Sequence, residues 1–395
     1  MDIEYILKHK NVPVLLFKIN EDYELSEFNV IFDEKRLPFG VKYYGKKEAQ
    51  FKQLSDWIEN RGLPRSRSDL ANIQHDMDVK NSIELSFGSY ALNLSDQYWV
   101  HKSDIDMNWN DVNFFANDFK EIINFDASGV YENVKDIVIA PDLTVDGSLK
   151  KKWIINNNER YLIKGSRYDE MQEPFNEYIA SNIMDLFDIK HVEYGLIKNK
   201  SNNMPLSVCK CMTDKDTDFI TAQMVLDMEL KENRNEYDRF MQICEKFGIN
   251  DAKERIDEMI AIDYLIGNTD RHTGNFGVIR NADNLEWINI VPIFDNGNSF
   301  CHNINYIDDM DKNINSLCRW MGGGNYEKLN LIDFPQWYSK DKENELIEIV
   351  INGLNKNEKI SEKKKSCLKK IVDIRIKEFE KIITGKKNKS ANGFR

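Results

Sequence analysis

The first third of the chain has the hydrophobic pattern of short strands rather than of long helices. Apolar residues are almost continuous over 12–19, which predicts a buried strand. Residues 51–59 carry apolar side chains at helical spacing, so we predict a helix there. Further short strands are predicted at 28–32 and 39–44, and the polar segment 95–126 is expected to form loops and helices. We therefore predict a strand-rich N-terminal domain over residues 1–135, without a ligand motif.

The pattern over residues 136–212 predicts a second, β-rich unit. Turn-like residues at 156–158 separate two short apolar runs, at 153–155 and 161–164, and this arrangement is typical of a β-hairpin. A helix is predicted over 173–187, where apolar side chains recur every fourth residue. Two more strands are predicted at 192–198 and 206–212.

The remainder, residues 213–395, is predicted to be mostly helical. The helix predicted at 253–266 should end at Gly267, because glycine readily adopts the left-handed conformation that closes a helix. Other helices are predicted at 219–230, 234–247, 341–353 and 361–383, followed by a frayed basic end from residue 386. The fold class predicted for the whole chain is α+β.

The composition narrows the class of protein. The 395 residues are 41% hydrophobic and 30% charged, as expected of a soluble protein with a large core. The net charge of −12 argues against extensive binding to nucleic-acid phosphates. The chain shows neither a secretory signal nor an apolar run of about 18 residues, so we expect no membrane span. The six cysteines form no C-x-x-C pair, and the six histidines lack zinc spacing, so we expect a reduced, cytoplasmic protein.

Candidate catalytic chemistry lies in the loop that follows the helix predicted at 253–266. Asp270 and Asn275 stand in this loop, before a short strand predicted at 276–279. Phosphoryl transfer needs a carboxylate that orients the attacking hydroxyl and accepts its proton, and it needs an oxygen ligand for Mg²⁺ close by. Asp270 and Asn275 can supply both from one loop.

A second carboxylate, Asp295, is expected at the end of an apolar strand. Gly297 follows it and permits a tight turn. Such an aspartate can ligate Mg²⁺ on the ATP phosphates, as the Asp-Phe-Gly aspartate does in protein kinases. Mg²⁺ prefers few carboxylates together with substrate oxygens, which suits Asp295, Asn275 and ATP.

The spacing of Asp270 and Asn275 is not specific on its own. It also occurs at Asp76 with Asn81 and at Asp308 with Asn313. The alternative interpretation is a pair of local Asx turns that cap backbone groups. The position between a helix and a strand, and the second carboxylate at Asp295, favour a phosphotransferase site.

Two neighbours of Asp270 have open interpretations. His272 either holds the loop through a structural hydrogen bond or contacts phosphate directly. Arg271 is either a phosphate contact or a solvated surface charge.

Upstream residues are candidates for binding the nucleotide phosphates. Gly147 and Ser148 lie in a predicted turn whose backbone N–H groups could approach phosphates, unless it is an ordinary hairpin turn. Lys164 ends a predicted strand and could reach the α- and β-phosphates, or it is an edge-strand lysine that favours solubility. Glu177 on the next helix could pair with Lys164 or be a surface residue.

The segment from Cys209 through Lys210 to Cys211 leads from the small sheet toward the helical part. Its backbone could read the edge of the adenine ring. The alternative is that the two cysteines are simply small buried residues.

These motifs resemble the HipA-like serine/threonine kinase family. The resemblance rests on Asn-x-Asp-x-His-x-x-Asn-Phe at 268–276, Pro-x-x-Asp at 292–295, Tyr-Leu-Ile-Lys at 161–164 and Asn-Glu at 176–177. It covers roughly residues 136–300 by motif and the helical remainder by layout. The N-terminal third is similar only in position and in its strand-rich character.

The resemblance implies a two-lobed protein-kinase-like fold that uses ATP and Mg²⁺, with a small ATP-binding lobe at 136–212 and a helical catalytic lobe at 213–395. Family members phosphorylate serine or threonine of protein substrates, can autophosphorylate in the phosphate loop, and can act as toxins paired with a DNA-binding antitoxin. By position, the resemblance implies Asp270 as catalytic base, Asn275 and Asp295 as Mg²⁺ ligands, Lys164 as phosphate lysine, residues 209–211 as hinge, and 146–150 as phosphate loop with Ser148 as the candidate autophosphorylation site.

Two other functions stay open. Asp-Arg-His-x-x-Asn at 270–275 is also similar to phosphoinositide kinases, so a lipid or small-molecule kinase is one alternative. A non-catalytic binding or repressor-partner module is the other. The turn after Asp295 has Asn296 where the Asp-Phe-Gly turn has an aromatic residue, so no aromatic-driven switch is expected.

Overall fold

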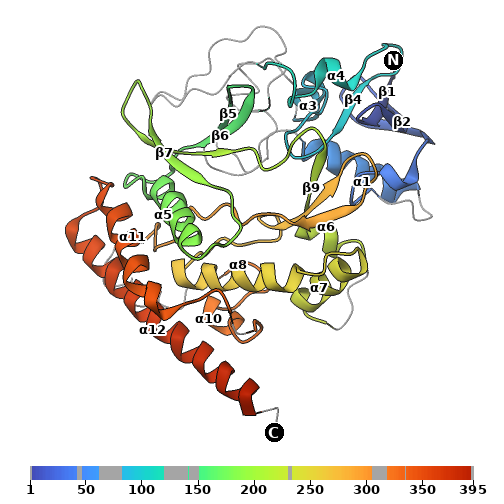
Figure 1. Cartoon of the computed structure of the whole chain (residues 1–395). Coiled ribbons are helices and arrows are strands. Elements are labelled where there is room, and N and C mark those ends of the chain that lie inside the picture. Colours follow the sequence, from blue (N-terminus) through green and yellow to red (C-terminus); the bar gives the residue numbers. More distant parts are fainter. Residues whose placement is uncertain are drawn as a thin grey trace.

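The structure is a computed structural model of the whole chain (Figure 1). It describes residues 2–41, 47–61, 82–119, 141, 151–229, 234–304, 318–333 and 335–392. Within these ranges the strands form three sheets, and the longest helices gather in the second half of the chain. In Figure 1 the N-terminal sheet lies at the upper right, and α8 crosses the middle of the molecule.

The N-terminal sheet is antiparallel and has the strand order β3-β2-β1-β4. Its strands are β1 Ile3–His9, β2 Val12–Ile19, β3 Leu25–Ile31 and β4 Tyr98–Lys102. Helices α1 (Lys47–Glu59) and α3 (Ser82–Gly88) cover it. The short helix η1 (Glu34–Arg36) lies between β3 and α1, and the short helix α4 (Trp109–Val112) follows β4. Leu7, Leu15, Phe17 and Leu54 are fully buried between the sheet and α1, as the apolar pattern predicts.

Two predictions for this domain need correction. The predicted segment of loops and helices at 95–126 contains β4, whose aromatic and β-branched residues pair with β1. Of the strand predicted at 39–44, residues 39–41 are a turn in which Gly40 has φ of 89°, and residues 42–44 lie outside the described ranges.

The second sheet has the order β5-β6-β8-β7 and confirms the predicted hairpin. Its strands are β5 Lys151–Asn156, β6 Glu159–Lys164, β7 Tyr194–Lys198 and β8 Pro205–Lys210. Asn157 and Asn158 form the hairpin turn with φ values of 50° and 62°, which asparagine tolerates better than most residues. Helix α5 (Gln172–Leu186) follows within a residue of its predicted bounds and packs on β7 and β8.

The third sheet has the order β11-β10-β9, and it contradicts one predicted helix. A helix was predicted at 219–230. In the structure, strand β9 (Thr217–Thr221) takes up the start of this range, and within the range only α6 (Ala222–Leu226) is helical. The physical reason is a cap: the Thr221 side chain accepts a hydrogen bond from the Met224 N–H and starts α6 there. The partner strands are β10 (Gly277–Asn281) and β11 (Trp287–Ile290).

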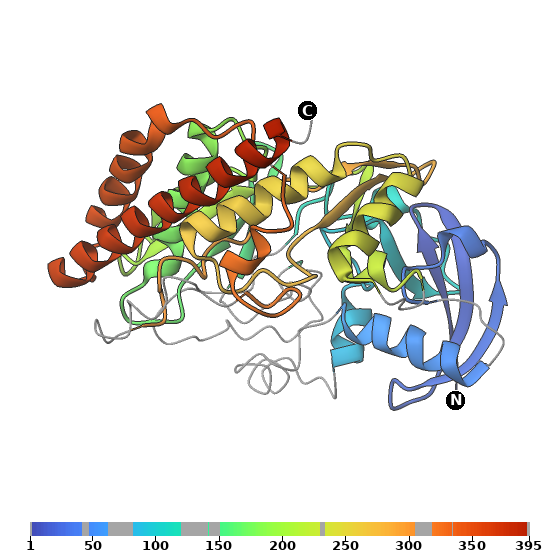
Figure 2. The same cartoon turned by 90° about the horizontal axis from the view of Figure 1, so that it is seen from below.

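The helical part holds the largest hydrophobic core. Figure 2 shows α8 (Ala252–Ile266) beside α12 (Glu362–Asn392), with α11 (Glu343–Asn355) on the other side of α12. Helix α12 continues to Asn392, past the frayed end predicted from residue 386. The remaining helices are α7 Glu236–Lys246, α10 Asn325–Lys328 and η4 Lys340–Lys342.

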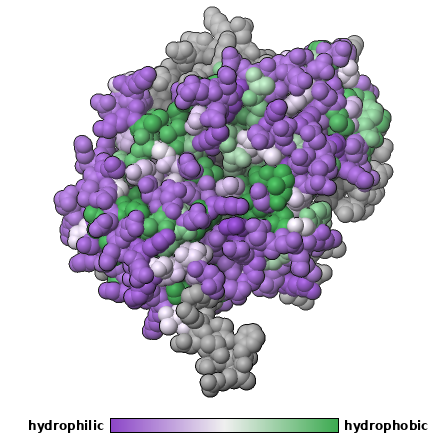
Figure 3. Space-filling view, viewed as in Figure 1, coloured by the Kyte–Doolittle hydropathy of each residue, from purple (hydrophilic) through white to green (hydrophobic). Residues whose placement is uncertain are grey.

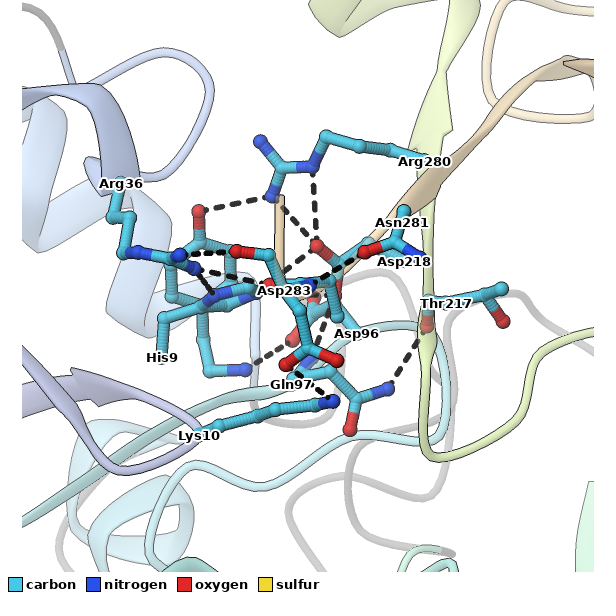
Figure 4. Close-up of polar contacts among 12 residues, drawn as sticks. His9, Lys10, Arg36, Asp96, Gln97, Thr217, Asp218, Arg280, Asn281 and Asp283 are labelled. Atoms are coloured by element: carbon cyan, nitrogen blue, oxygen red, sulfur yellow. Dashed lines mark hydrogen bonds and ion pairs between the residues drawn. The ribbon is translucent and has the colours of Figure 1, made fainter. Parts of the chain in front are cut away.

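A buried polar cluster joins the N-terminal domain to the third sheet (Figure 4). Asp218 of β9 is 1% exposed; it accepts hydrogen bonds from Arg280 of β10 at 2.7 Å and from the backbone N–H of Gln97 at 3.0 Å. His9 of β1 contacts the same carboxylate at 3.0 Å. The N-terminal domain is therefore attached directly to β9 and to β10, the strand that follows the candidate catalytic loop.

The surface and the helices agree with the composition. Hydrophilic residues dominate the face seen in Figure 3, and hydrophobic residues show only in smaller patches across its middle. Over the described ranges, none of the helices combines the length and the apolar character needed to cross a bilayer.

Candidate active site

The loop that carries Asp270 begins where α8 ends. Gly267 closes α8 with φ of 65°, as predicted. Asn268 then holds the first turn: its Nδ2 donates to Asp263 Oδ1 at 3.0 Å, and its Oδ1 accepts from the Asp270 N–H at 3.0 Å. Asn275 Nδ2 donates to the Asp270 carbonyl at 3.2 Å. Asp270 and Asn275 therefore lie at the two ends of one closed turn, as the sequence predicts.

Arg271 is buried, so it is neither the phosphate contact nor the solvated surface charge that the sequence suggested. Its side chain is 0% exposed, and its guanidinium binds Asp263 through two hydrogen bonds of 2.9 Å. It also donates to the Asn275 carbonyl, to the Phe294 carbonyl at 2.6 Å and to Asn296 Oδ1 at 2.7 Å. A planar guanidinium has five N–H donors, and here they link α8, the Asp270 loop and the Asp295 turn. The correction is physical: the charge is buried because Asp263 neutralises it.

Asp295 was predicted at the end of a strand, but the structure does not place it at the end of a regular strand. Strand β11 ends at Ile290, and Ile293 then makes an isolated parallel bridge to His191. Asp295 itself has φ of 58°, the left-handed region that few residues other than glycine adopt. Its backbone N–H donates to the Tyr194 hydroxyl at 3.3 Å. An aspartate held in this conformation by its surroundings is a frequent feature of functional turns.

Lys164, Glu177 and Asp295 meet in one ionic cluster. Lys164 Nζ donates to Glu177 Oε1 and to Asp295 Oδ1, both at 2.8 Å. Lys164 and Glu177 are almost fully buried, whereas the Asp295 side chain is 25% exposed. The predicted pairing of Lys164 with Glu177 is present, and the solvent-accessible end of the cluster is the Asp295 carboxylate.

The cluster shifts the pKa values of its members in opposite directions. Burial alone would lower the pKa of Lys164, but Asp295 and Glu177 outweigh it and raise that pKa well above its usual value. Burial would likewise raise the pKa of Asp295, but Lys164, Lys151 and Arg271 outweigh it and lower that pKa. Burial raises the pKa of Glu177, against the opposing effect of Lys164. Two carboxylates share one ammonium, so the cluster carries an excess negative charge when all three groups are ionised.

The Asp270 carboxylate has two neighbours that the sequence did not predict. Asn298 Nδ2 donates to Asp270 Oδ2 at 2.6 Å, and Arg319 Nη1 donates to Asp270 Oδ1 at 2.7 Å. Thr269 adds two hydrogen bonds from the same loop to the Asn298 carbonyl, of 3.0 and 3.1 Å. The Asp270 loop and the segment after Asp295 are therefore joined directly as well as through Arg271.

His272 lies inside the Asp270 turn. Its Nδ1 accepts a hydrogen bond from the Gly274 N–H at 3.1 Å, which is the kind of contact that holds a loop. A Cβ on Gly274 would lie 2.8 Å from the imidazole, so glycine at 274 gives the ring its space. This geometry favours the structural interpretation, and direct contact of His272 with phosphate remains a prediction.

The predicted hinge residues have different surroundings. Cys209 is buried, and burial raises the pKa of its thiol to about 12. Lys210 is exposed and pairs with Glu159, while the backbone N–H of Cys211 donates to the Arg160 carbonyl at 2.8 Å. Contact with an adenine edge through this N–H would require that bond to be given up. Gly147 and Ser148 lie outside the described residues.

The loop that carries Asn275 and the turn that carries Asp295 offer oxygen atoms of the kind that a hard cation binds. Asn275 Nδ2 is engaged by the Asp270 carbonyl, which leaves Oδ1 as the ligand atom of that amide. Asn298 Oδ1 and Ser299 Oγ are buried, and neither finds a hydrogen-bond partner in the described part of the chain. Within the same part of the chain, no three His, Cys, Asp or Glu side chains converge as a metal site. A cation here would thus depend on oxygens of a second molecule, as Mg²⁺ does with ATP.

The residues that sequence reasoning missed are mostly polar groups inside apolar or buried segments. Asp263 had the clearest signal in the sequence, because it is the only charged residue in the run Ile260 to Ile266. In the structure it lies on α8 and is 2% exposed. An isolated charge at a core position needs a partner, and Arg271 eight residues later is that partner. Tyr194, Asn298 and Arg319 had no comparable signal in the sequence.

The fold and the two joined loops define a kinase-like protein of mixed α+β architecture, with sheets in its N-terminal part and helices in its C-terminal part. A family model described as the HipA-like C-terminal domain matches residues 142–353, which is more than half of the chain. The chain belongs to this HipA-like family. The predicted family and fold class are thereby confirmed, whereas the domain boundaries after residues 135 and 212 remain predictions.

The relatives are distant. The serine/threonine-protein kinase CtkA of Helicobacter pylori is 28% identical over an alignment of 220 positions. This match covers 47% of this chain and 64% of that protein, which is less than two thirds of the relative. A crystal structure of CtkA aligns with 61% of this chain and 95% of its own, at 20% identity and a TM-score of 0.48. The structure of HipA from Shewanella oneidensis MR-1, solved with HipB and operator DNA, aligns with 95% of this chain and 97% of its own, at 11% identity and a TM-score of 0.54.

Proposed function

We propose that this protein is an ATP- and Mg²⁺-dependent serine/threonine protein kinase. The observation that carries the proposal is the arrangement around Arg271. This buried guanidinium ties the Asp270 loop to the turn that presents Asp295, while Asp295 meets Lys164 and Glu177 on its other side. A carboxylate for the acceptor, an oxygen pair for metal and a lysine for phosphates are thus held on one connected frame.

Each residue has a separate task in this proposal. MgATP, when bound, would supply the γ-phosphoryl group and a divalent charge on the phosphates, with ADP as the leaving group. Asp270 orients the acceptor hydroxyl and takes up its proton as the hydroxyl attacks. Asn275 and Asp295 would hold the metal through oxygen atoms, and Lys164 would orient the phosphates once it has exchanged its contact with Asp295 for them. Positioning and charge neutralisation then account for most of the rate.

Family membership supports the finer assignments without deciding them. Protein serine or threonine as acceptor is proposed because CtkA is named a serine/threonine-protein kinase. An antitoxin partner, and with it a toxin role, is proposed because the aligned HipA was solved with HipB. Autophosphorylation at Ser148, and phosphate contacts by Gly147 and Ser148, belong to the same proposal and rest on the resemblance.

Incubation of the purified protein with radiolabelled ATP and Mg²⁺ tests the activity. We expect transfer to protein hydroxyls, including the protein's own, which phosphosite mapping by mass spectrometry would identify. Asp270→Asn should lower transfer about 10²- to 10⁴-fold, because the group that accepts the proton is lost. Asp295→Ala and Lys164→Met should abolish it, and Lys198→Met is the control because Lys198 is an exposed lysine of the same sheet.

The same experiment separates the alternatives. Transfer to a lipid or sugar but to no protein would replace the proposal with a small-molecule kinase. Full activity of Asp295→Ala would remove the metal role of that residue. A cellular effect that is unchanged in Asp270→Asn would point to a non-catalytic binding module.

A further inference from the structure

An open cavity of about 560 Å³ lies beside the Asp270 loop. Its lining includes three arginines against one glutamate, although the chain as a whole carries a net charge of −12. The lining residues are Arg234, Asn235, Glu236, Arg239, Arg319, Met321 and Gly322. Because the protein as a whole is acidic, an anionic ligand is attracted to this basic cavity more strongly than to the rest of the surface.

Arg319 connects this cavity to the candidate catalytic base. Its Nη1 donates to Asp270 Oδ1 at 2.7 Å, and its side chain is 63% exposed. The next residue, Trp320, donates its backbone N–H to the Arg271 carbonyl at 2.8 Å. The backbone that carries Arg319 is therefore fixed on the catalytic loop, while its guanidinium remains accessible to a second molecule.

The other two arginines add positive charge to the lining of the cavity. Arg239 of α7 is 7% exposed and donates to the carbonyls of Leu226 and Glu229, so its position is fixed. Arg234 is exposed, just before the start of α7, and donates to the Gln242 side chain at 2.7 Å. The N-terminal end of α7 adds a partial positive charge, although Glu236 in its first turn offsets part of it.

We propose that this cavity binds an acidic side chain of the acceptor protein, close in sequence to the serine or threonine that is phosphorylated. The inference rests on the proposed kinase function and names its substrate class. An arginine guanidinium matches a carboxylate in a bidentate geometry, and Arg319 can exchange the Asp270 carboxylate for one on the substrate. That exchange releases Asp270 Oδ1 to accept the proton of the acceptor hydroxyl.

The geometry also limits where the acidic residue stands. Arg319 touches Asp270, so a carboxylate bound to Arg319 lies within a few residues of the hydroxyl on an extended peptide, at about 3.3–3.6 Å per residue. We therefore expect the acidic residue within about three positions of the acceptor. A nucleic-acid ligand fits less well, because its affinity needs many phosphate contacts along a surface, and the lining of this cavity offers three arginines.

Peptide kinetics test the substrate class. Serine peptides that carry aspartate, asparagine or lysine at each of the three positions on either side of the serine are compared by kcat/KM. We expect the aspartate peptide at the best position to exceed its asparagine counterpart by about tenfold or more, which is the usual strength of a charge-assisted hydrogen bond. Arg234→Gln and Arg319→Gln should each reduce that ratio of kcat/KM values toward one. In Arg234→Gln the change should come from KM.

Lys246→Gln is the matched control, since Lys246 is an exposed basic residue of α7 that does not line the cavity. It should keep the full preference for aspartate. Equal kcat/KM for the aspartate and asparagine peptides at all six positions would overturn the inference. Such equality with measurable transfer would leave the kinase proposal standing, whereas no transfer to any acceptor, including the protein itself, would refute the kinase proposal.

A binding measurement tests the cavity without phosphoryl transfer. Fluorescence anisotropy of the labelled aspartate peptide is titrated with the wild-type protein and with Arg234→Gln, at two salt concentrations. Weaker binding to the variant and at higher salt supports the inference. Binding that is insensitive to Arg234→Gln, or a cavity that binds an RNA oligonucleotide in place of the peptide, refutes it.

Discussion

The role of Arg271 gives the sharpest prediction, because one side chain joins three segments of the site. We consider Arg271→Met, which keeps the length and the apolar stem but removes the guanidinium. All five hydrogen bonds of that group are lost at once, two to Asp263 and one each to Asn275, Phe294 and Asn296. The substitution therefore separates the loops while leaving most of the packing volume in place.

The cost follows from the burial of Asp263. This carboxylate is 2% exposed, and after the substitution the 3.0 Å hydrogen bond from Asn268 Nδ2 is the one that remains to it among the described residues. An uncompensated buried charge destabilises by about 3–5 kcal/mol. A domain of ordinary stability has about 5–15 kcal/mol in total, so the loss is a large part of the free energy of unfolding. Arg271→Lys keeps the charge but has only three donors, and it should cost less.

The assay is urea unfolding followed by circular dichroism, combined with phosphoryl transfer on the same samples. The double variant, Asp263→Leu with Arg271→Met, removes both charges. Its loss of unfolding free energy should be smaller than the sum of the losses in the two single variants by at least about 2 kcal/mol, because a buried ion pair replaced by apolar side chains is often tolerated. Transfer should stay reduced by tenfold or more in the double variant, since small misplacements of reacting groups have large effects on rate.

Two results would refute this reasoning. A loss below about 1 kcal/mol in Arg271→Met would mean that Asp263 finds another partner. Recovery of both stability and full transfer in the double variant would mean that the loops are aligned without the guanidinium.

Three further predictions concern other parts of the fold. Asp218→Asn should destabilise by about 3–5 kcal/mol because it leaves Arg280 buried without its carboxylate, whereas Lys18→Gln at an exposed pair should leave stability nearly unchanged in the same urea unfolding assay. Burial, assisted by Arg167, lowers the pKa of His302 to about 4, so the unfolded chain binds a proton at this residue before the folded chain does as pH falls from about 6.5. The free energy of unfolding should therefore drop by up to about 3 kcal/mol between pH 6.5 and pH 4, and His302→Gln should lack that part of the pH dependence. Gly277→Ala should destabilise by about 1–3 kcal/mol because its Cβ would lie 2.0 Å from the Ile220 carbonyl oxygen, while Gly385→Ala in α12 meets nothing within 4 Å and should stabilise slightly.

Local patterns predicted most of the elements correctly. The strand at 12–19, the hairpin around Asn157 and the helix that ends at Gly267 all have signals within a few residues: continuous apolar side chains, a turn pair and a closing glycine. The segment at 217–226 shows where such signals fail. Its strand is stabilised by pairing with β10, about sixty residues away in the chain, and only the Thr221 cap marks the true start of the helix.

The site was predictable where a residue type has few uses at its position. Glu177 was expected either to pair with Lys164 or to lie on the surface, and the structure places its Oε1 2.8 Å from Lys164 Nζ. Asp270 and Asn275 were predicted in one loop because they are five positions apart between a predicted helix and a predicted strand. Arg271 could not be assigned, because its burial depends on Asp263 of α8 and on Phe294 and Asn296 of the Asp295 turn, which are two separate segments of the chain.

The charge balance of the Lys164 cluster leads to a prediction about nucleotide binding. Glu177 is buried, and its second oxygen accepts from the Asn296 N–H at 3.1 Å, so its position beside Lys164 is fixed. Asp295 is the partly exposed member, so its contact with Lys164 is the one that a ligand can replace. In the proposed function, phosphates that bind Lys164 would leave Asp295 without its cation, and Mg²⁺ would supply the missing charge. Nucleotide without metal should therefore bind more weakly than MgATP, and Asp295→Asn should reduce that difference, which isothermal titration with and without Mg²⁺ would measure. An equal metal effect in the variant would show that Asp295 is not the residue through which metal and nucleotide are coupled.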